Sequence, residues 1–90
     1  MSERAKGGML TIAGIQLTCG PDVKVNFAKA LDLVRVAVER GAKIICFAEC
    51  FAWPWFPRKG SEAQRALAEP IPGPMTQALQ LVAEQAQAVL

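Results

Sequence analysis

The chain has 90 residues, of which 52% are hydrophobic and 20% are charged. This is the balance of one small globular domain at most, and it argues against both a disordered chain and a membrane protein. The net charge of +2 is small and the basic residues are scattered, so we expect neither a nucleic-acid nor a membrane partner. The sequence has no histidine, which excludes serine-histidine-acid triads, cysteine-histidine dyads and histidine-bearing zinc sites from this chain.

The first eight residues, MSERAKGG, are polar and end in two glycines, which predicts a flexible N-terminal extension over residues 1–8. The apolar run that follows is interrupted by polar residues, so it fits neither a signal peptide nor a transmembrane helix. The three cysteines are Cys19, Cys46 and Cys50. They form no CxxC pair, so we expect reduced thiols and a cytoplasmic location.

Residues 9–17 (MLTIAGIQL) mix apolar and β-branched types over the length of a strand, and they predict a first strand. Asp22 is placed to cap a helix that follows, and Gly41 is placed to end it in the left-handed conformation. The apolar face of this helix is expected to carry Phe27, Leu31, Val34 and Val38.

Residues 43–48 (KIICFA) form a continuous apolar run, typical of a parallel strand covered on both faces, so strand, helix and strand predict a βαβ unit. Two proline-rich stretches, residues 53–57 and 70–74, are predicted loops because proline lacks the N–H donor. Thr76 is expected to cap a second helix, and residues 88–90 are expected to begin a third strand. A strand that stops there leaves an unpaired edge, so we expect this chain to be part of a longer one.

Glu49 is the only ionisable group apart from two thiols in residues 44–57 (IICFAECFAWPWFP), and it follows the predicted second strand. Ligands bind at the carboxyl ends of parallel strands, and a carboxylate that loses its hydration among aromatic rings is suited to general-base chemistry. Two chemically idle alternatives stay open. The glutamate is either solvated on a surface loop, or paired with Arg58 or Lys59 in a salt bridge that fixes the loop.

An ordered set of features then points to a known family. The set runs from a strand ending near Gln16, through Asn26, Gly41-Ala42-Lys43, an apolar strand, Glu49 and an aromatic loop, to residues 68–74 (AEPIPGP) before a helix. From about Met9 to Leu90 it resembles the start of enzymes of the nitrilase (carbon-nitrogen hydrolase) superfamily. The AEPIPGP stretch is more similar to the amidase and N-carbamoyl amide hydrolase branches than to true nitrilases. The sequence departs from the family at Ala48, where a proline is usual.

The resemblance implies an α/β fold in which residues 9–90 form the N-terminal βαβ-α(β) part of a four-layer αββα sandwich. It implies a Glu-Lys-Cys triad that hydrolyses a non-peptide C–N bond of a small amide, N-carbamoyl amide or nitrile, without metal or organic cofactor. Glu49 would be the general base, the lysine and cysteine would lie in later segments absent from this chain, and Trp55 would contact substrate. The full-length form would be a homo-oligomer and the isolated chain inactive. Cys46 and Cys50 do not occupy the nucleophile's position, and we expect them to be small buried hydrophobes.

Two other classes of function fit the residues. An aromatic loop over residues 51–56 is suited to anchor a partner in a non-enzymatic interaction module. Cys46 and Cys50 suggest a thioredoxin-like thiol protein, although their spacing is wrong for the usual redox pair. A compact soluble species would favour the module, and redox cycling would favour the thiol protein. A reading frame that continues past Leu90 into a lysine-bearing loop and a strand-end cysteine would favour the hydrolase.

Overall fold

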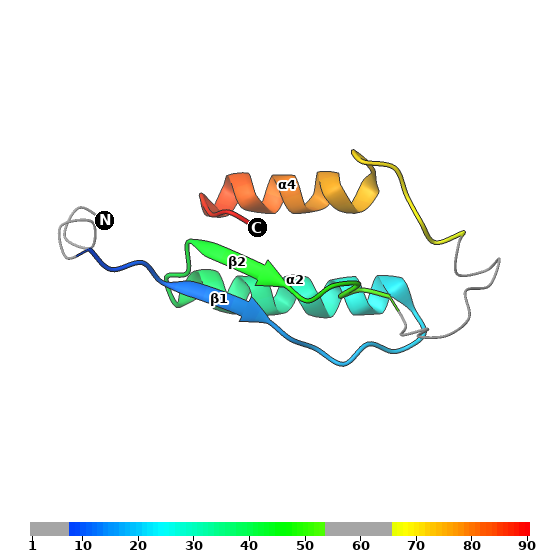
Figure 1. The fold of residues 1–90 in the computed structure, drawn as a ribbon, viewed down its shortest axis with the longest axis horizontal. Coiled ribbons are helices and arrows are strands. Elements are labelled where there is room, and N and C mark those ends of the chain that lie inside the picture. The colour runs from blue at the N-terminus through cyan, green and yellow to red at the C-terminus, as the bar shows by residue number, and fades with distance from the viewer. Residues whose placement is uncertain (1–7, 54–65) are drawn as a thin grey trace.

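In the part of the chain that the structure describes, the fold is a short parallel sheet with two helices (Figure 1). The computed structural model describes residues 8–53 and 66–90. Its elements are β1 (Ile12–Ile15), α2 (Val23–Glu39), β2 (Ile44–Phe47) and α4 (Pro74–Ala86). The strands β1 and β2 are parallel, with Ile12 opposite Ile44 and Ile15 opposite Phe47, and α2 connects them. The predicted βαβ unit is therefore confirmed, whereas residues 1–7 of the expected extension lie outside the described part.

After α4 the chain returns to the sheet at Val89. This residue forms a parallel bridge with Ile44 on the side of β2 away from β1. The N–H of Ile45 donates to the Val89 carbonyl at 2.7 Å, and the N–H of Val89 donates to the Lys43 carbonyl at 2.8 Å. The prediction that a third strand begins in residues 88–90 is therefore confirmed.

Both ends of α2 follow from single residues. The Asp22 side chain accepts the N–H of Lys24 at 2.9 Å, which satisfies one of the donors left free at a helix start. At the other end Gly41 has φ of 91°, and the N–H of Ala42 donates to the Ala37 carbonyl at 3.0 Å. These are the features of a glycine-terminated helix end, so both predicted ends are confirmed.

The helix α2 packs on the sheet through a narrower line of residues than its apolar pattern predicts. Its buried residues are Asn26, Ala30, Val34 and Ala37. Of the predicted face only Val34 is buried, while Phe27, Leu31 and Val38 are half-buried. The small side chains of Ala30 and Ala37 fit where the helix lies against the sheet, so the larger residues flank the contact.

The helix α4 begins at Pro74, two residues before Thr76, so the prediction that Thr76 caps it is wrong. Proline is tolerated at the first position because its missing N–H would have no partner inside the helix. The preceding residue, Gly73, has no side chain to act as a cap. Glu69 takes this role from the loop, because its carboxylate accepts the N–H of Met75 at 2.7 Å.

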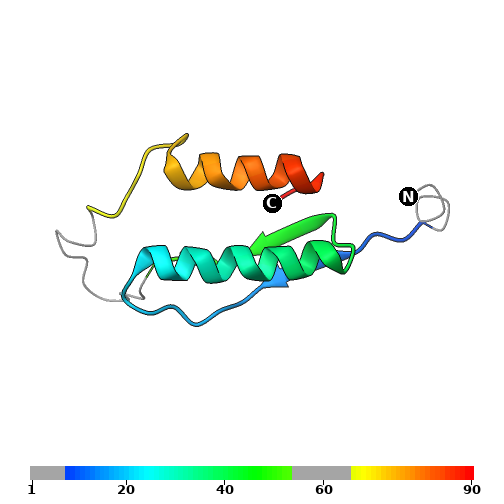
Figure 2. The ribbon, with the colours of Figure 1, turned by 180° about the vertical axis from the view of Figure 1, so that it is seen from behind.

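Both helices cover the same face of the sheet. In Figure 2, from behind, α2 lies in front of the two strands, and Val82 of α4 packs against the same core as α2. The opposite face carries Ile12, Ile44 and Val89, which are 68%, 40% and 64% exposed. Of the two faces expected to be covered, the described residues therefore cover one. In these parts of the chain no helix has the length and apolar character needed to cross a membrane.

Candidate functional site

Glu49 lies two residues beyond the carboxyl end of β2, on the turn that follows the strand. This is the end of a parallel sheet at which ligands usually bind. Its side chain is exposed, and it makes no ion pair or hydrogen bond with any of residues 8–53 or 66–90. The expectation that neighbouring aromatic rings remove water from this carboxylate is therefore wrong for the described chain.

The aromatic rings do not surround Glu49, because they pack on one another. Phe47 and Phe51 are stacked, with ring centroids 4.3 Å apart and planes at 22°. The ring of Phe27 from α2 lies 6.3 Å from that of Phe51. These rings therefore point toward the helices, while Glu49 stays in solvent.

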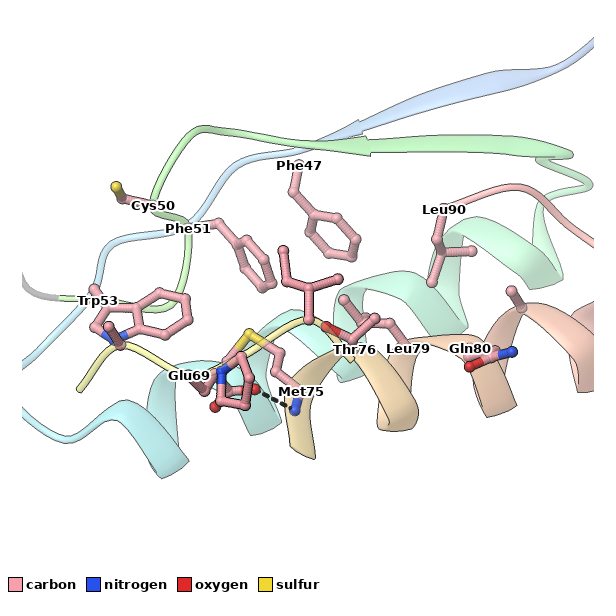
Figure 3. Close-up of a pocket in the computed structure, with 14 residues that line it drawn as sticks. Phe47, Cys50, Phe51, Trp53, Glu69, Met75, Thr76, Leu79, Gln80 and Leu90 are labelled. Atoms are coloured by element: carbon pink, nitrogen blue, oxygen red, sulfur yellow. Dashed lines mark hydrogen bonds between the residues drawn. The ribbon is translucent and has the colours of Figure 1, made fainter. Parts of the chain in front are cut away.

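The rings of Phe47 and Phe51 form one wall of an apolar pocket of about 770 Å³ between the sheet and α4. Figure 3 shows Phe47 and Phe51 on one side of it, and Thr76, Leu79 and Gln80 on the other. Leu90 and Trp53 complete its two ends, and Glu49 does not line it. The pocket is therefore a space between the sheet and its covering helix, separate from the carboxylate.

The turn that carries Glu49 has an unusual backbone. Cys50, the next residue, has φ of 54°, in the left-handed region that costs a non-glycine residue about 1–2 kcal/mol. The N–H of Trp53 donates to the Cys50 carbonyl at 3.2 Å and closes the turn. Strained backbone of this kind persists only where the surrounding structure fixes it.

The side chain of Asn26 helps to hold the backbone of this turn in place. It is fully buried at 0% exposure, at the start of α2. Its amide nitrogen donates to the carbonyls of Ala52 and Gly20, both at 2.9 Å, and its oxygen accepts the N–H of Gly20 at 2.9 Å. One side chain therefore joins three segments: the loop before α2, the helix itself and the turn after β2.

Cys19 adds a second tie to the same turn. Its thiol donates to the carbonyl of Phe51 at 2.8 Å, across 32 positions of sequence. Ala52, which follows, is fully buried. The turn is thus held at two consecutive carbonyls, one by Cys19 from the segment between β1 and α2 and one by Asn26 from the first turn of α2.

The other cysteines are not the buried hydrophobes that we expected. Cys46 and Cys50 are both exposed, and all three thiols are free. Cys46 is exposed because its register partner in β1 is Gly14, on the bare face of the sheet. In Figure 3 the Cys50 side chain points away from the pocket interior.

No lysine of the described chain forms an ion pair with Glu49. Lys43 precedes β2 and Glu49 follows it, and the strand between them spans about 13 Å at roughly 3.3 Å per residue. Lys29 donates to the Thr18 carbonyl at 2.7 Å. Trp55, the expected substrate contact, lies outside the described residues, as do Arg58 and Lys59. Within the described ranges no group of histidine, cysteine and carboxylate side chains is suited to hold a metal ion.

Sequence reasoning did not find the role of Asn26 or Cys19. A signal existed for Asn26, because it shares the spacing of the buried positions 30, 34 and 37 on α2. A polar residue on a buried helix face predicts an internal hydrogen-bond partner. For Cys19 the sequence holds no such signal, since its bond to Phe51 depends on how two distant loops meet.

Comparisons with known proteins add an independent finding. The family model described as carbon-nitrogen hydrolase matches residues 11–90. The chain is 38% identical over 68 residues to an N-carbamoylputrescine amidase of Solanum lycopersicum, covering 76% of this chain and 23% of that protein. It is 34% identical over 71 residues to an omega-amidase of Xenopus laevis, covering 79% and 24%. The chain thus spans less than a quarter of the length of these relatives. No solved structure matches it.

Proposed function

The chain belongs to the carbon-nitrogen hydrolase family, and from this premise we propose that it is the N-terminal part of an amidase in which Glu49 is the general base. The observation that carries the proposal is the position of Glu49. It is the one carboxylate in residues 44–53, and it stands at the carboxyl end of a parallel strand inside the matched region. The amidase names of the relatives favour amides over nitriles as the substrate class.

The chemistry proposed is acyl transfer to a thiol. Glu49 accepts the proton of a cysteine thiol, and the resulting thiolate attacks the carbonyl carbon of the amide. A lysine stabilises the negative charge that develops on the substrate oxygen. The protonated Glu49 gives its proton to the leaving nitrogen as the C–N bond breaks, so ammonia or an amine departs and a thioester remains. The regenerated carboxylate then takes a proton from water, which attacks the thioester and releases the acid and the thiol. No step in this scheme calls for a metal or an organic cofactor.

None of the three cysteines present is assigned as the nucleophile. Cys46 lies on the bare sheet face, and Cys50 is adjacent to Glu49 on a turn whose backbone is held in the left-handed region. We place the nucleophile and the lysine in sequence beyond Leu90, consistent with the fraction of the relatives that this chain covers. The chain alone would then have no turnover, because the nucleophilic thiol that its base would deprotonate is not among its three cysteines.

The exposure of Glu49 fits the same proposal. A base in bulk water gains little from its neighbours, whereas exclusion of water strengthens every electrostatic interaction in a site. The sheet face with Ile12, Ile44 and Val89 is exposed and apolar, and an apolar patch of this kind usually packs against another part of the protein. We propose that later segments of the full-length chain exclude water from Glu49 as the remaining walls of the site. Other later segments would cover the bare sheet face as the second sheet of the αββα sandwich. A homo-oligomer of the full-length form belongs to the same proposal.

The competing interaction module has less support in the described half of its loop. Phe51 packs between Phe27 and Phe47, so its ring is not free to anchor a partner. Trp53 is half-buried and lines the pocket. The rest of that loop, residues 54–56, lies outside the described part.

The experiment is to read the coding sequence past Leu90, express the complete product and assay it for ammonia release. N-carbamoylputrescine and an ω-amide are the first substrates to test, because relatives carry those names. Turnover of either, in a product with a lysine-bearing loop and a later strand-end cysteine, supports the proposal. A reading frame that lacks such a cysteine contradicts it.

A further inference from the structure

We infer that Asn26, assisted by Cys19, is a positioning residue that holds the Glu49 turn in its working geometry. The inference rests on the proposed role of Glu49 as general base. Neither side chain would touch substrate, and both would act through the backbone of the turn.

The first step concerns how the turn is anchored. On its N-terminal side Phe47 is held by the sheet, in register with Ile15. On its C-terminal side the carbonyls of Phe51 and Ala52 accept bonds from Cys19 and Asn26. Glu49 therefore lies between two fixed points, and no described residue bonds to its side chain.

The second step concerns what remains without these bonds. Among the described residues, the turn would keep the local bond from the Trp53 N–H to the Cys50 carbonyl, the contacts of the Phe51 ring with Phe47 and Phe27, and the packing of buried Ala52. The hydrogen bond can move with the turn, because both of its partners belong to it. The ring contacts are non-directional, so they fix the backbone less closely than a hydrogen bond does. A left-handed φ at Cys50 then has little to hold it, and the backbone that carries the carboxylate can relax.

The third step concerns the cost of such movement for catalysis. A general base has to lie within hydrogen-bond reach of the proton that it takes. A displacement of about 1 Å can lower a rate by about 100-fold. Loss of the Asn26 bonds should therefore lower kcat strongly and change KM less, because these bonds hold the backbone that carries the base and neither side chain would touch substrate.

The test uses the full-length protein with two variants. Asn26→Ala removes the bond to the Ala52 carbonyl in the turn, and Asp22→Ala is the matched control, since it removes hydrogen bonds at the same helix end without touching the turn. Assays are run at a temperature where both variants are folded. We expect kcat to fall by about 10- to 100-fold in Asn26→Ala alone, with KM within about twofold of wild type. Equal kcat values in the two variants would overturn the inference.

A second readout does not depend on turnover. Hydrogen exchange of the backbone amides in residues 48–53 should speed up in Asn26→Ala and stay at the wild-type rate in Asp22→Ala. Unchanged exchange in this segment would also overturn the inference. Glu49→Gln is assayed in parallel. If that variant keeps wild-type turnover, the proposed function fails, while the exchange result still decides whether Asn26 holds the turn.

Cys19 provides a milder pair of variants if Asn26→Ala does not fold. Cys19→Ala removes the donor to the Phe51 carbonyl, and Cys19→Ser restores a donor of similar size. We expect a several-fold lower kcat in Cys19→Ala and recovery in Cys19→Ser, both with unchanged KM. Wild-type kcat in Cys19→Ala would contradict the inference.

Discussion

The bare face of the sheet gives a quantitative prediction about the complete protein. Ile12 is 68% exposed in the described chain, where no residue covers that face. Complete burial of an isoleucine side chain stabilises a protein by about 1.5–3 kcal/mol. A second sheet placed on this face would therefore gain about 1–2 kcal/mol from Ile12 alone. Ile12→Ala in the full-length protein would lose this and leave a cavity, for a total of about 2–5 kcal/mol.

The control for this variant is Leu81→Ala. Leu81 is 54% exposed on α4, so its exposure is close to that of Ile12, but it belongs to the helix layer. In an αββα sandwich that layer faces solvent, and truncation there should change the free energy of unfolding by no more than about 0.5 kcal/mol. Urea unfolding of the two full-length variants gives the comparison. Equal and small losses would refute the claim that a second sheet covers the face with Ile12.

Three further predictions follow from single contacts. Gly73→Ala should lower the free energy of unfolding by about 1–3 kcal/mol, because the new methyl group would collide with the Pro70 carbonyl, and an unchanged urea midpoint would contradict this. Asp22→Ala should cost about 1 kcal/mol in the same assay through loss of the α2 cap, and a neutral result would show that the cap contributes little. Cys46 should react with a thiol reagent in the 90-residue chain and be protected in the full-length protein. Equal reactivity in both would show that its face is not covered.

The local structure was predictable where one residue decides it. Asp22 and Gly41 fix the ends of α2, and both act as their types predict. The start of α4 was not predictable, because its capping group is the carboxylate of Glu69, five residues before the helix. A sequence pattern identifies a capping residue when it lies directly before the helix. Glu69 lies further back, and it reaches the N–H of Met75 because of the way in which the intervening loop folds.

The position of Glu49 was predictable and its surroundings were not. The strand before it is a continuous apolar run, which places the carboxylate at a strand end. Whether nearby rings cover it depends on where they turn, and Phe47 and Phe51 turn toward each other and toward the helices. The hydrogen bonds of Asn26 likewise join segments that lie 26 positions apart, so the loop geometry had to be known first.

The proposed function depends on one carboxylate, and its replacement in the full-length protein is the most direct test. Glu49→Gln keeps the shape of the side chain and removes its ability to accept a proton. We predict a fall in kcat of at least about 100-fold, the usual contribution of a general base. Glu39→Gln is the matched control, because Glu39 is an exposed glutamate on α2 that pairs with Arg35 at 3.9 Å, and it should keep full activity. Wild-type turnover in Glu49→Gln would contradict the account.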